Sequence, residues 1–120
     1  MTEQELVERT KKMAIRVIHL VRSLPKMDES KIIGRQVLRS ATSVAANYRS
    51  ACKARSHRDF INKLGIAEEE ADETQLWLEL IIDAKLLGRH RVEHLLAEVS
   101  ELTAILAASR VTASKRLRKP

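Results

Sequence analysis

The 120-residue sequence has few of the residues that interrupt helices and few of those that favour strands. It contains three glycines, two prolines and three aromatic residues, whereas alanine, leucine, glutamate, lysine and arginine are abundant. The abundant residues have high helix propensity, while strands are enriched in aromatic and β-branched residues, so the composition favours an all-α fold. A chain of this length corresponds to one domain of ordinary size, and a second domain is not needed.

Cysteine and long apolar runs are also scarce. Cys52 is the only cysteine, so the chain forms no internal disulfide and nothing indicates an oxidising compartment. His57 is close in sequence, but no third group that would orient it as a base is visible, and we interpret Cys52 as structural. The longest uncharged stretch, residues 40–48, is too short to span a membrane, and residues 1–12 lack the apolar region of a signal peptide. We therefore expect a soluble, cytoplasmic protein without a membrane partner.

Apolar residues recur three or four positions apart in four segments, which predicts four amphipathic helices. The first is expected over residues 2–24, because Pro25 ends it. Asp28 or Ser30 is expected to cap the second helix, which continues to the basic run at residues 53–55.

The third helix is expected to start at a capping box over residues 56–59, to continue to Leu87 and to end at Gly88. The fourth begins near Arg89, and Ser109 is expected to open a tail. Short connections leave too few residues to return to the starting end, so consecutive helices run antiparallel. The sequence therefore predicts an up-and-down antiparallel four-helix bundle over residues 1–109 and a basic, flexible tail over residues 110–120.

The third helix carries two seams at helical spacing. The first comprises Phe60, Leu64, Ala67, Ala71, Thr74, Leu78 and Ile81. The second comprises Ile66, Glu70, Glu73, Trp77, Leu80, Ala84 and Leu87. A helix in an isolated bundle needs only one apolar stripe, so we expect a second copy of the chain to cover Ile66, Trp77 and Leu80. The alternative is that Trp77 fills a thick core within one chain.

Seven acids and no base lie on the third helix between Leu64 and Ala84. If the second and third helices are antiparallel about a turn near Arg55, Arg39 lies level with Glu70 and Glu73. We therefore predict a buried structural ion network of these three residues, and not an acid/base pair for catalysis.

Paired carboxylates on a helix can also indicate a di-iron site. That chemistry needs Glu-x-x-His pairs on separate helices. None of the four histidines follows a glutamate at this spacing. We therefore expect no metal, no cofactor and no enzymatic activity.

The positive charge is concentrated in the tail. The net charge is +6, and residues 110–120 hold five bases and no acid, which leaves 17 bases and 16 acids in the remainder. The candidate phosphate contacts are the bases around the second turn and in the tail: Arg49, Lys53, Arg55, Arg58, Arg110, Lys115, Arg116, Arg118 and Lys119. Such a cluster attracts RNA or DNA backbones without reading sequence, and the three aromatic residues lie on apolar stripes, so no stacking platform is expected. The alternative is a scaffold that organises a partner enzyme and binds no nucleic acid itself.

Two stretches carry a resemblance to a known family: residues 38–49, LRSATSVAANYR, and residues 63–80, KLGIAEEEADETQLWLEL. Together they resemble the four-helix-bundle family of proteins encoded in intervening sequences of bacterial 23S ribosomal RNA genes. The resemblance covers about residues 7–106 and leaves out the tail. It extends more distantly to the accessory variability protein of diversity-generating retroelements.

The resemblance implies a homopentameric ring of bundles. For the distant relative it implies a basic barrel that engages nucleic acid and a reverse transcriptase. No catalytic residue comes with it.

Overall fold

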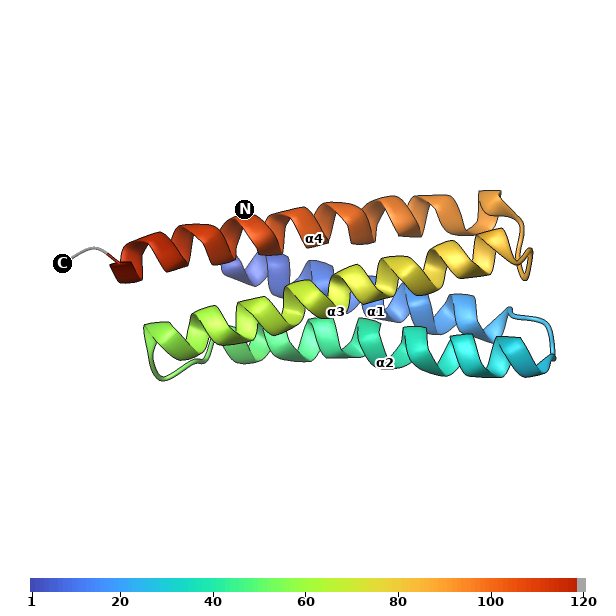
Figure 1. Cartoon of the computed structure of the whole chain (residues 1–120), viewed down its shortest axis with the longest axis horizontal. Coiled ribbons are helices and arrows are strands. Elements are labelled where there is room, and N and C mark those ends of the chain that lie inside the picture. The colour runs from blue at the N-terminus through green and yellow to red at the C-terminus, as the bar shows by residue number, and fades with distance from the viewer. Residues whose placement is uncertain (119–120) are drawn as a thin grey trace.

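The computed structural model describes residues 1–118, which form four helices and no strand (Figure 1). The helices are α1 (Glu3–Arg22), α2 (Asp28–Ala51), α3 (His57–Asp83) and α4 (Arg89–Arg118). Consecutive helices run in opposite directions, and the bundle measures 54 × 21 × 20 Å. Each helix contacts two others: α2 and α3 share the most contacts, and α1 and α4 the fewest. The predicted all-α, up-and-down four-helix bundle is confirmed.

The N-terminal ends of the helices follow their local sequence in two of three described caps. The hydroxyl of Thr2 accepts a hydrogen bond from the backbone N–H of Glu5 at 3.1 Å, and the hydroxyl of Ser56 accepts one from the N–H of Asp59 at 3.0 Å. The predicted cap of α2 is wrong, because Met27 occupies the cap position and supplies no side-chain acceptor. Acids in the first turn, beginning with Asp28, instead face the positive end of the helix dipole.

Helix α3 ends earlier than the sequence predicted. Its last residue is Asp83, and Lys85 turns the chain with a φ of 59°, in the left-handed region. Gly88, the expected stop, does not have a positive φ. The physical reason lies in Leu86 and Leu87, which are buried and close this end of the core. The chain must leave the helix before them to turn both side chains inward.

Helix α4 continues past Ser109 to Arg118, so the expected helix end at Ser109 is wrong. Ala113 is buried, and the carbonyl oxygen of Ala113 lies 2.8 Å from Nε2 of His57 at the start of α3. The last turns of α4 therefore pack against α3. The predicted flexibility of residues 110–120 remains a prediction, and Lys119 lies outside the described residues.

The first seam of α3 forms the centre of the core, as predicted. Leu64, Leu78 and Ile81 are fully buried. Thr74 is also buried, and its hydroxyl lies 2.8 Å from the hydroxyl of Ser40 on α2. The hydrogen bond between the two hydroxyls offsets the free-energy cost of burying them between α2 and α3.

Candidate nucleic-acid interface

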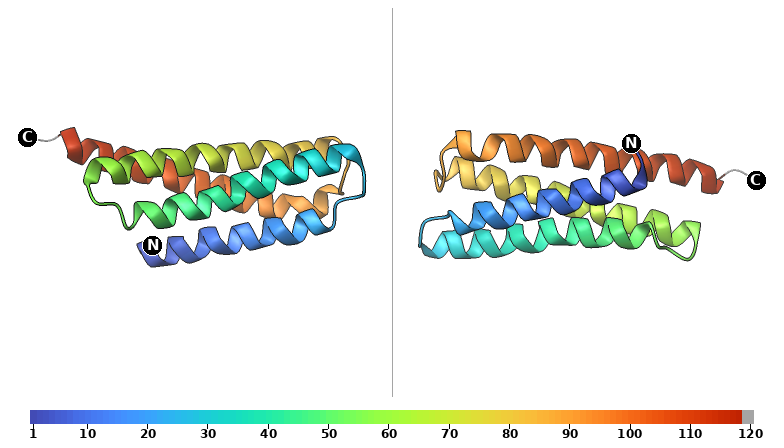
Figure 2. Two further views of the ribbon diagram at one scale, coloured as in Figure 1. Left: turned by 90° about the horizontal axis from the view of Figure 1, so that it is seen from below. Right: turned by 180° about the vertical axis from the view of Figure 1, so that it is seen from behind.

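The turn between α2 and α3, the end of α4 and the chain's N-terminus all lie at one end of the bundle (Figure 2). The contact between His57 and Ala113 brings the end of α4 beside the start of α3. Four of the predicted phosphate contacts gather there with exposed side chains: Arg55, Arg58, Lys115 and Arg116. We call these four residues the basic end. Acids such as Asp59 and Glu3 also lie toward this end, and at the opposite end bases such as Arg89 alternate with acids such as Glu93.

Arg110 is placed differently from the other bases of the tail. Its guanidinium donates to the carboxylate of Glu68 on α3, and this hydrogen bond raises the pKa of Arg110. Its charge is therefore compensated within the chain. The side chain of Arg118 lies outside the described residues, as does Lys119.

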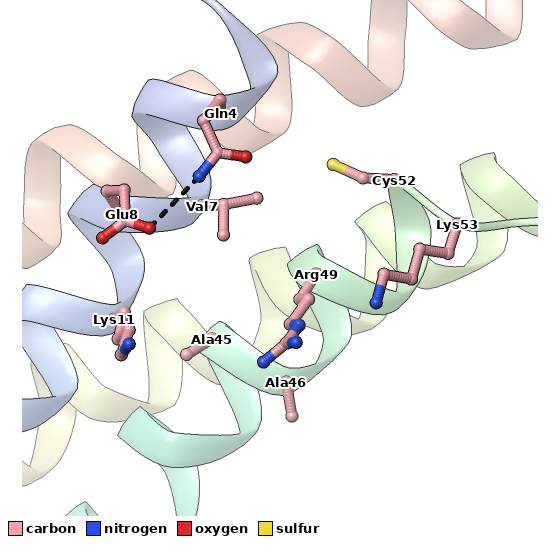
Figure 3. Close-up of a pocket in the computed structure, with 9 residues that line it drawn as sticks. All are labelled: Gln4, Val7, Glu8, Lys11, Ala45, Ala46, Arg49, Cys52 and Lys53. Carbon is pink, nitrogen blue, oxygen red and sulfur yellow. Dashed lines mark hydrogen bonds between the residues drawn. The ribbon is translucent and has the colours of Figure 1, made fainter.

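Arg49 and Lys53 instead line a cleft of about 630 Å³ between α1 and α2, which adjoins the basic end because Lys53 lies in the same turn as Arg55 (Figure 3). We call this the α1/α2 cleft. Its lining residues are Gln4, Val7, Glu8, Lys11, Ala45, Ala46, Arg49, Cys52 and Lys53. Lys11 was not among the predicted site residues. The sequence holds only part of the signal, because the antiparallel pairing of α1 with α2 places the first half of α1 beside the second half of α2.

The predicted interface residues are only partly covered. Ile66 is 37% exposed, while Trp77 and Leu80 are half-buried against the rest of the chain. The indole N–H of Trp77 donates to the carboxylate of Glu73 at 3.3 Å. Leu76 belongs to neither predicted seam and is 48% exposed, more than any of the three. An apolar side chain in that position is the clearest sign of an unpartnered surface on α3.

The predicted pairing of Arg39 with Glu70 and Glu73 is confirmed. One guanidinium nitrogen lies 2.9 Å from Glu70 Oε2, and the other donates to Glu73 Oε1. The hydrogen bond to Glu73 contributes most to raising the pKa of Arg39. The prediction that this network is buried is wrong, since the Arg39 side chain is 50% exposed. It lies at the surface because it bridges the outer edges of α2 and α3.

A second arginine bridge, between α1 and α4, was not predicted. Arg9 makes two 2.8 Å hydrogen bonds to the carboxylate of Glu98 and lies 2.9 Å from Glu101. The bond to Arg9 lowers the pKa of Glu98. Arg9 and Glu98 are 89 positions apart in the sequence, so only a comparison of levels between the first and fourth helices would predict their pairing.

The surroundings of Cys52 favour the structural interpretation. Burial raises the pKa of its thiol, whereas a reactive thiol needs a lowered one. His57 bonds to the carbonyl of Ala113 and is thus engaged elsewhere. Over residues 1–118, no group of three or more His, Cys, Asp or Glu side chains is arranged to hold a metal ion. None of the four helices, as far as they are described, is long and apolar enough to cross a membrane.

The comparisons with known proteins agree with this fold. A comparison with curated protein sequences finds no match. The chain is similar to a crystal structure of a protein with unknown function from the S23 ribosomal protein family, from Bacteroides thetaiotaomicron VPI-5482, with 35% sequence identity and a TM-score of 0.82. The similarity covers 92% of this chain and 98% of that one. A family model for 23S rRNA-intervening sequence proteins matches residues 2–108, most of the four helices, and the chain therefore belongs to this family.

Proposed function

We propose that this chain is a non-enzymatic, homo-oligomeric bundle protein that binds nucleic-acid backbones through its basic end. One observation carries the proposal: the contact between His57 and Ala113 holds the bases of α4 beside those of the α2–α3 turn. The chain thereby gathers at one end two pairs of cations, Arg55 with Arg58 and Lys115 with Arg116, and the two pairs lie far apart in the sequence.

The basic end is available to an anion. Among the side chains that the structure describes, Arg55, Arg58, Lys115 and Arg116 form no ion pair. They are exposed, so they attract phosphates over a distance of about 8 Å, the Debye length at physiological salt. Tyr48 is buried and the other two aromatic residues are half-buried, which leaves no platform for stacking bases. Binding to the backbone without sequence preference is the mode that these residues support.

Assembly supports the same function by multiplying the basic end. The exposed apolar residues of α3, Ile66 and Leu76, favour contact with a second chain. The family resemblance implies a homopentamer, in which five basic ends would present 20 bases. A polyanion that spans several of these ends gains affinity from effective concentration, without any new contact.

The salt dependence of binding to generic RNA and DNA tests the proposal. The logarithm of the binding constant should fall linearly with the logarithm of salt concentration, by about 0.7 to 0.9 per neutralised phosphate. A variant with Arg55, Arg58, Lys115 and Arg116 changed to Gln should lose most of this slope. A matched variant at the opposite end, with Lys26, Lys85, Arg89 and Arg91 changed to Gln, should keep it. Binding that is absent at about 50 mM salt, where phosphate contacts are least screened, would contradict the proposal.

Point substitutions are preferable to deleting the chain after Ser109. The deletion also removes buried Ala113 and the ion pair of Arg110 with Glu68, so it changes packing as well as charge. If no nucleic acid binds, the exposed apolar residues of α3 favour the second candidate, a scaffold for a partner protein. Retention of a partner enzyme by an assembly that ignores RNA and DNA would identify that function.

A further inference from the structure

We propose that the outer face of α3 in one copy docks into the α1/α2 cleft of a second copy. The inference rests on the homo-oligomer of the proposed function and names the two surfaces that meet. The interface would have two halves. One is an acidic stripe with exposed apolar residues on α3, and the other is the basic α1/α2 cleft with its apolar floor.

The first half is the line of residues that points most directly away from the bundle on α3. We call it the α3 stripe, and its members, all exposed and three or four positions apart, are Ile66, Glu69, Asp72, Leu76, Glu79 and Asp83. It contains four acids, two large apolar residues and no base. Among the side chains that the structure describes, its four acids form no ion pair, in contrast to Glu68, Glu70 and Glu73 on the flanks of the same helix. The stripe therefore has both apolar area and negative charge to offer a partner.

The second half is the α1/α2 cleft, which has the complementary character. Its floor includes the half-buried Val7 and Ala45, and its rim carries the exposed Ala46 together with Lys11, Arg49 and Lys53 (Figure 3). Among the described side chains these three bases form no ion pair. Glu8 is the one acid that lines the cleft, and it accepts a hydrogen bond from the side-chain amide of Gln4 at 3.2 Å. The cleft is therefore basic at the rim and apolar beneath.

The two halves also match in length. From Ile66 to Leu76 the stripe extends about 15 Å at 1.5 Å per helical residue, and the α2 wall of the cleft extends about 10 Å from Ala45 to Cys52, the C-cap residue, with Lys53 continuing it into the α2–α3 turn. Along this length Glu69 and Asp72 lie between the two apolar residues. Docking would set the two acids against the basic rim while Ile66 and Leu76 cover the small residues of the floor. This is the recognition of an amphipathic helix by a groove, with charge complementarity to fix the orientation.

The contact is head-to-tail. The stripe lies on α3 and the cleft lies between α1 and α2, and α1 and α3 do not contact each other in the bundle. Each copy can therefore donate its stripe to one neighbour and receive the stripe of another. A contact of this kind closes into a ring or continues as a filament, whereas stripe-to-stripe pairing would stop at a dimer.

Charge reversal on each half tests the proposal. The cleft variant carries Lys11→Glu and Arg49→Glu, and the stripe variant carries Glu69→Lys and Asp72→Lys. Each places like charges across the interface, so each should raise the dissociation constant of assembly by about a hundredfold or more and give a monomer by light scattering. An equal mixture of the two variants should form a hetero-oligomer, because the intact stripe of the cleft variant fits the intact cleft of the stripe variant and the two reversed surfaces are also complementary in charge. A chain with all four substitutions should assemble again.

The matched control reverses two exposed bases away from both surfaces, Arg89→Glu and Arg91→Glu, with the same change in net charge as the cleft variant. It should assemble as the wild type does. Circular dichroism and melting temperature verify that every variant is folded. Leu76→Ala, a milder change at an exposed position, should weaken assembly without altering charge. Cleft and stripe variants that stay assembled overturn the inference, and so does a mixture of monomeric variants that forms no hetero-oligomer.

The test separates this inference from the proposed function. If the wild type is an oligomer and the cleft variant remains one but loses part of its salt-dependent binding to RNA, the cleft holds phosphate and the docking inference fails alone. If the wild type is a monomer at micromolar concentration, the assembly part of the proposed function fails as well. If the cleft variant is monomeric and its basic end still binds RNA, both stand.

Discussion

At two helix–helix interfaces of the bundle, an arginine pairs with two glutamates of the antiparallel neighbouring helix. The surroundings of the two arginines differ. Arg39 joins α2 to α3, the pair of helices with the most contacts, and its side chain is 50% exposed. Arg9 joins α1 to α4, the pair with the fewest, and its side chain is 23% exposed. The interface between α2 and α3 is held by apolar packing, and the ion pairs of Arg39 lie at its surface. The interface between α1 and α4 has less packing, so its bridge contributes a larger share of what holds these two helices together.

The largest expected effect comes from the packing itself. Leu78 is fully buried on the inner seam of α3, and Leu78→Ala removes buried methyl groups and leaves a cavity. The free energy of unfolding should fall by about 2 to 5 kcal/mol. Chemical denaturation measures it. A loss below about 1 kcal/mol would mean that the neighbouring side chains relax into the cavity. Apolar packing would then not be the difference between the α2–α3 and α1–α4 interfaces.

The second prediction concerns the ion pairs of Arg9 between α1 and α4, the two neighbouring helices with the fewest contacts. Arg9→Met leaves the carboxylates of Glu98 and Glu101 without their partner, and we expect the free energy of unfolding to fall by about 1 to 2 kcal/mol. Hydrogen exchange should quicken in α1 before the other helices. Adding Glu98→Met should recover part of the loss, and a double-mutant cycle gives the coupling energy. If exchange quickens equally in all four helices, α1 is not held separately.

The third prediction applies the same substitution to the exposed bridge. Arg39→Met should lower the melting temperature less than Arg9→Met does, because exposed ion pairs are screened by water and salt. The comparison is made at two salt concentrations, where the effect of Arg39→Met should shrink more. If Arg39→Met and Arg9→Met lower the melting temperature equally, the two interfaces do not differ in how much their ion pairs contribute.

The smallest effect is a dependence on pH. The pKa of Glu98 is lowered in the folded chain by the bond to Arg9, so the folded state binds this proton less readily than the unfolded state. The stabilisation is present above the ordinary glutamate pKa of about 4.3 and is lost as pH falls through the lowered folded value. The difference in free energy of unfolding between wild type and Glu98→Gln should therefore diminish below about pH 4.3. A difference that stays constant to pH 3 would show that the carboxylate charge plays no part.

The sequence predicts those features that depend on residues close in the chain or on helical spacing. The Ser56 cap, the inner seam from Leu64 to Ile81 and the level pairing of Arg39 with Glu70 are of this kind. Helix ends set by tertiary packing were predicted wrongly. Leu86 and Leu87 are drawn into the core and displace the turn from Gly88 to Lys85, and a periodic pattern does not show which end of a bundle must be closed.

The candidate site was predictable only in part for a similar reason. Charge counting along the chain identified the bases, but it did not separate Arg49 and Lys53, which line a cleft, from Arg58 at the bundle end. Lys11 was missed because it comes from another helix and is brought to the cleft by the antiparallel pairing of α1 with α2. Leu76 was missed because it falls between the two seams and is apolar where the pattern expects a polar residue.

The unequal lengths of α1 and α4 have a mechanical consequence. The first residues of α1 lie beside Ile105 and Ser109, so the turns of α4 beyond this level are supported by α3 alone. A helical segment held on one side opens at a lower free energy than one enclosed in the core, and it does so without disturbing the rest of the bundle. We therefore expect the last turns of α4, which carry Lys115 and Arg116, to open more readily than the rest of the bundle. The charges of Lys115 and Arg116 would then shift to follow an irregular polyanion while residues 89–109 of α4 keep their place.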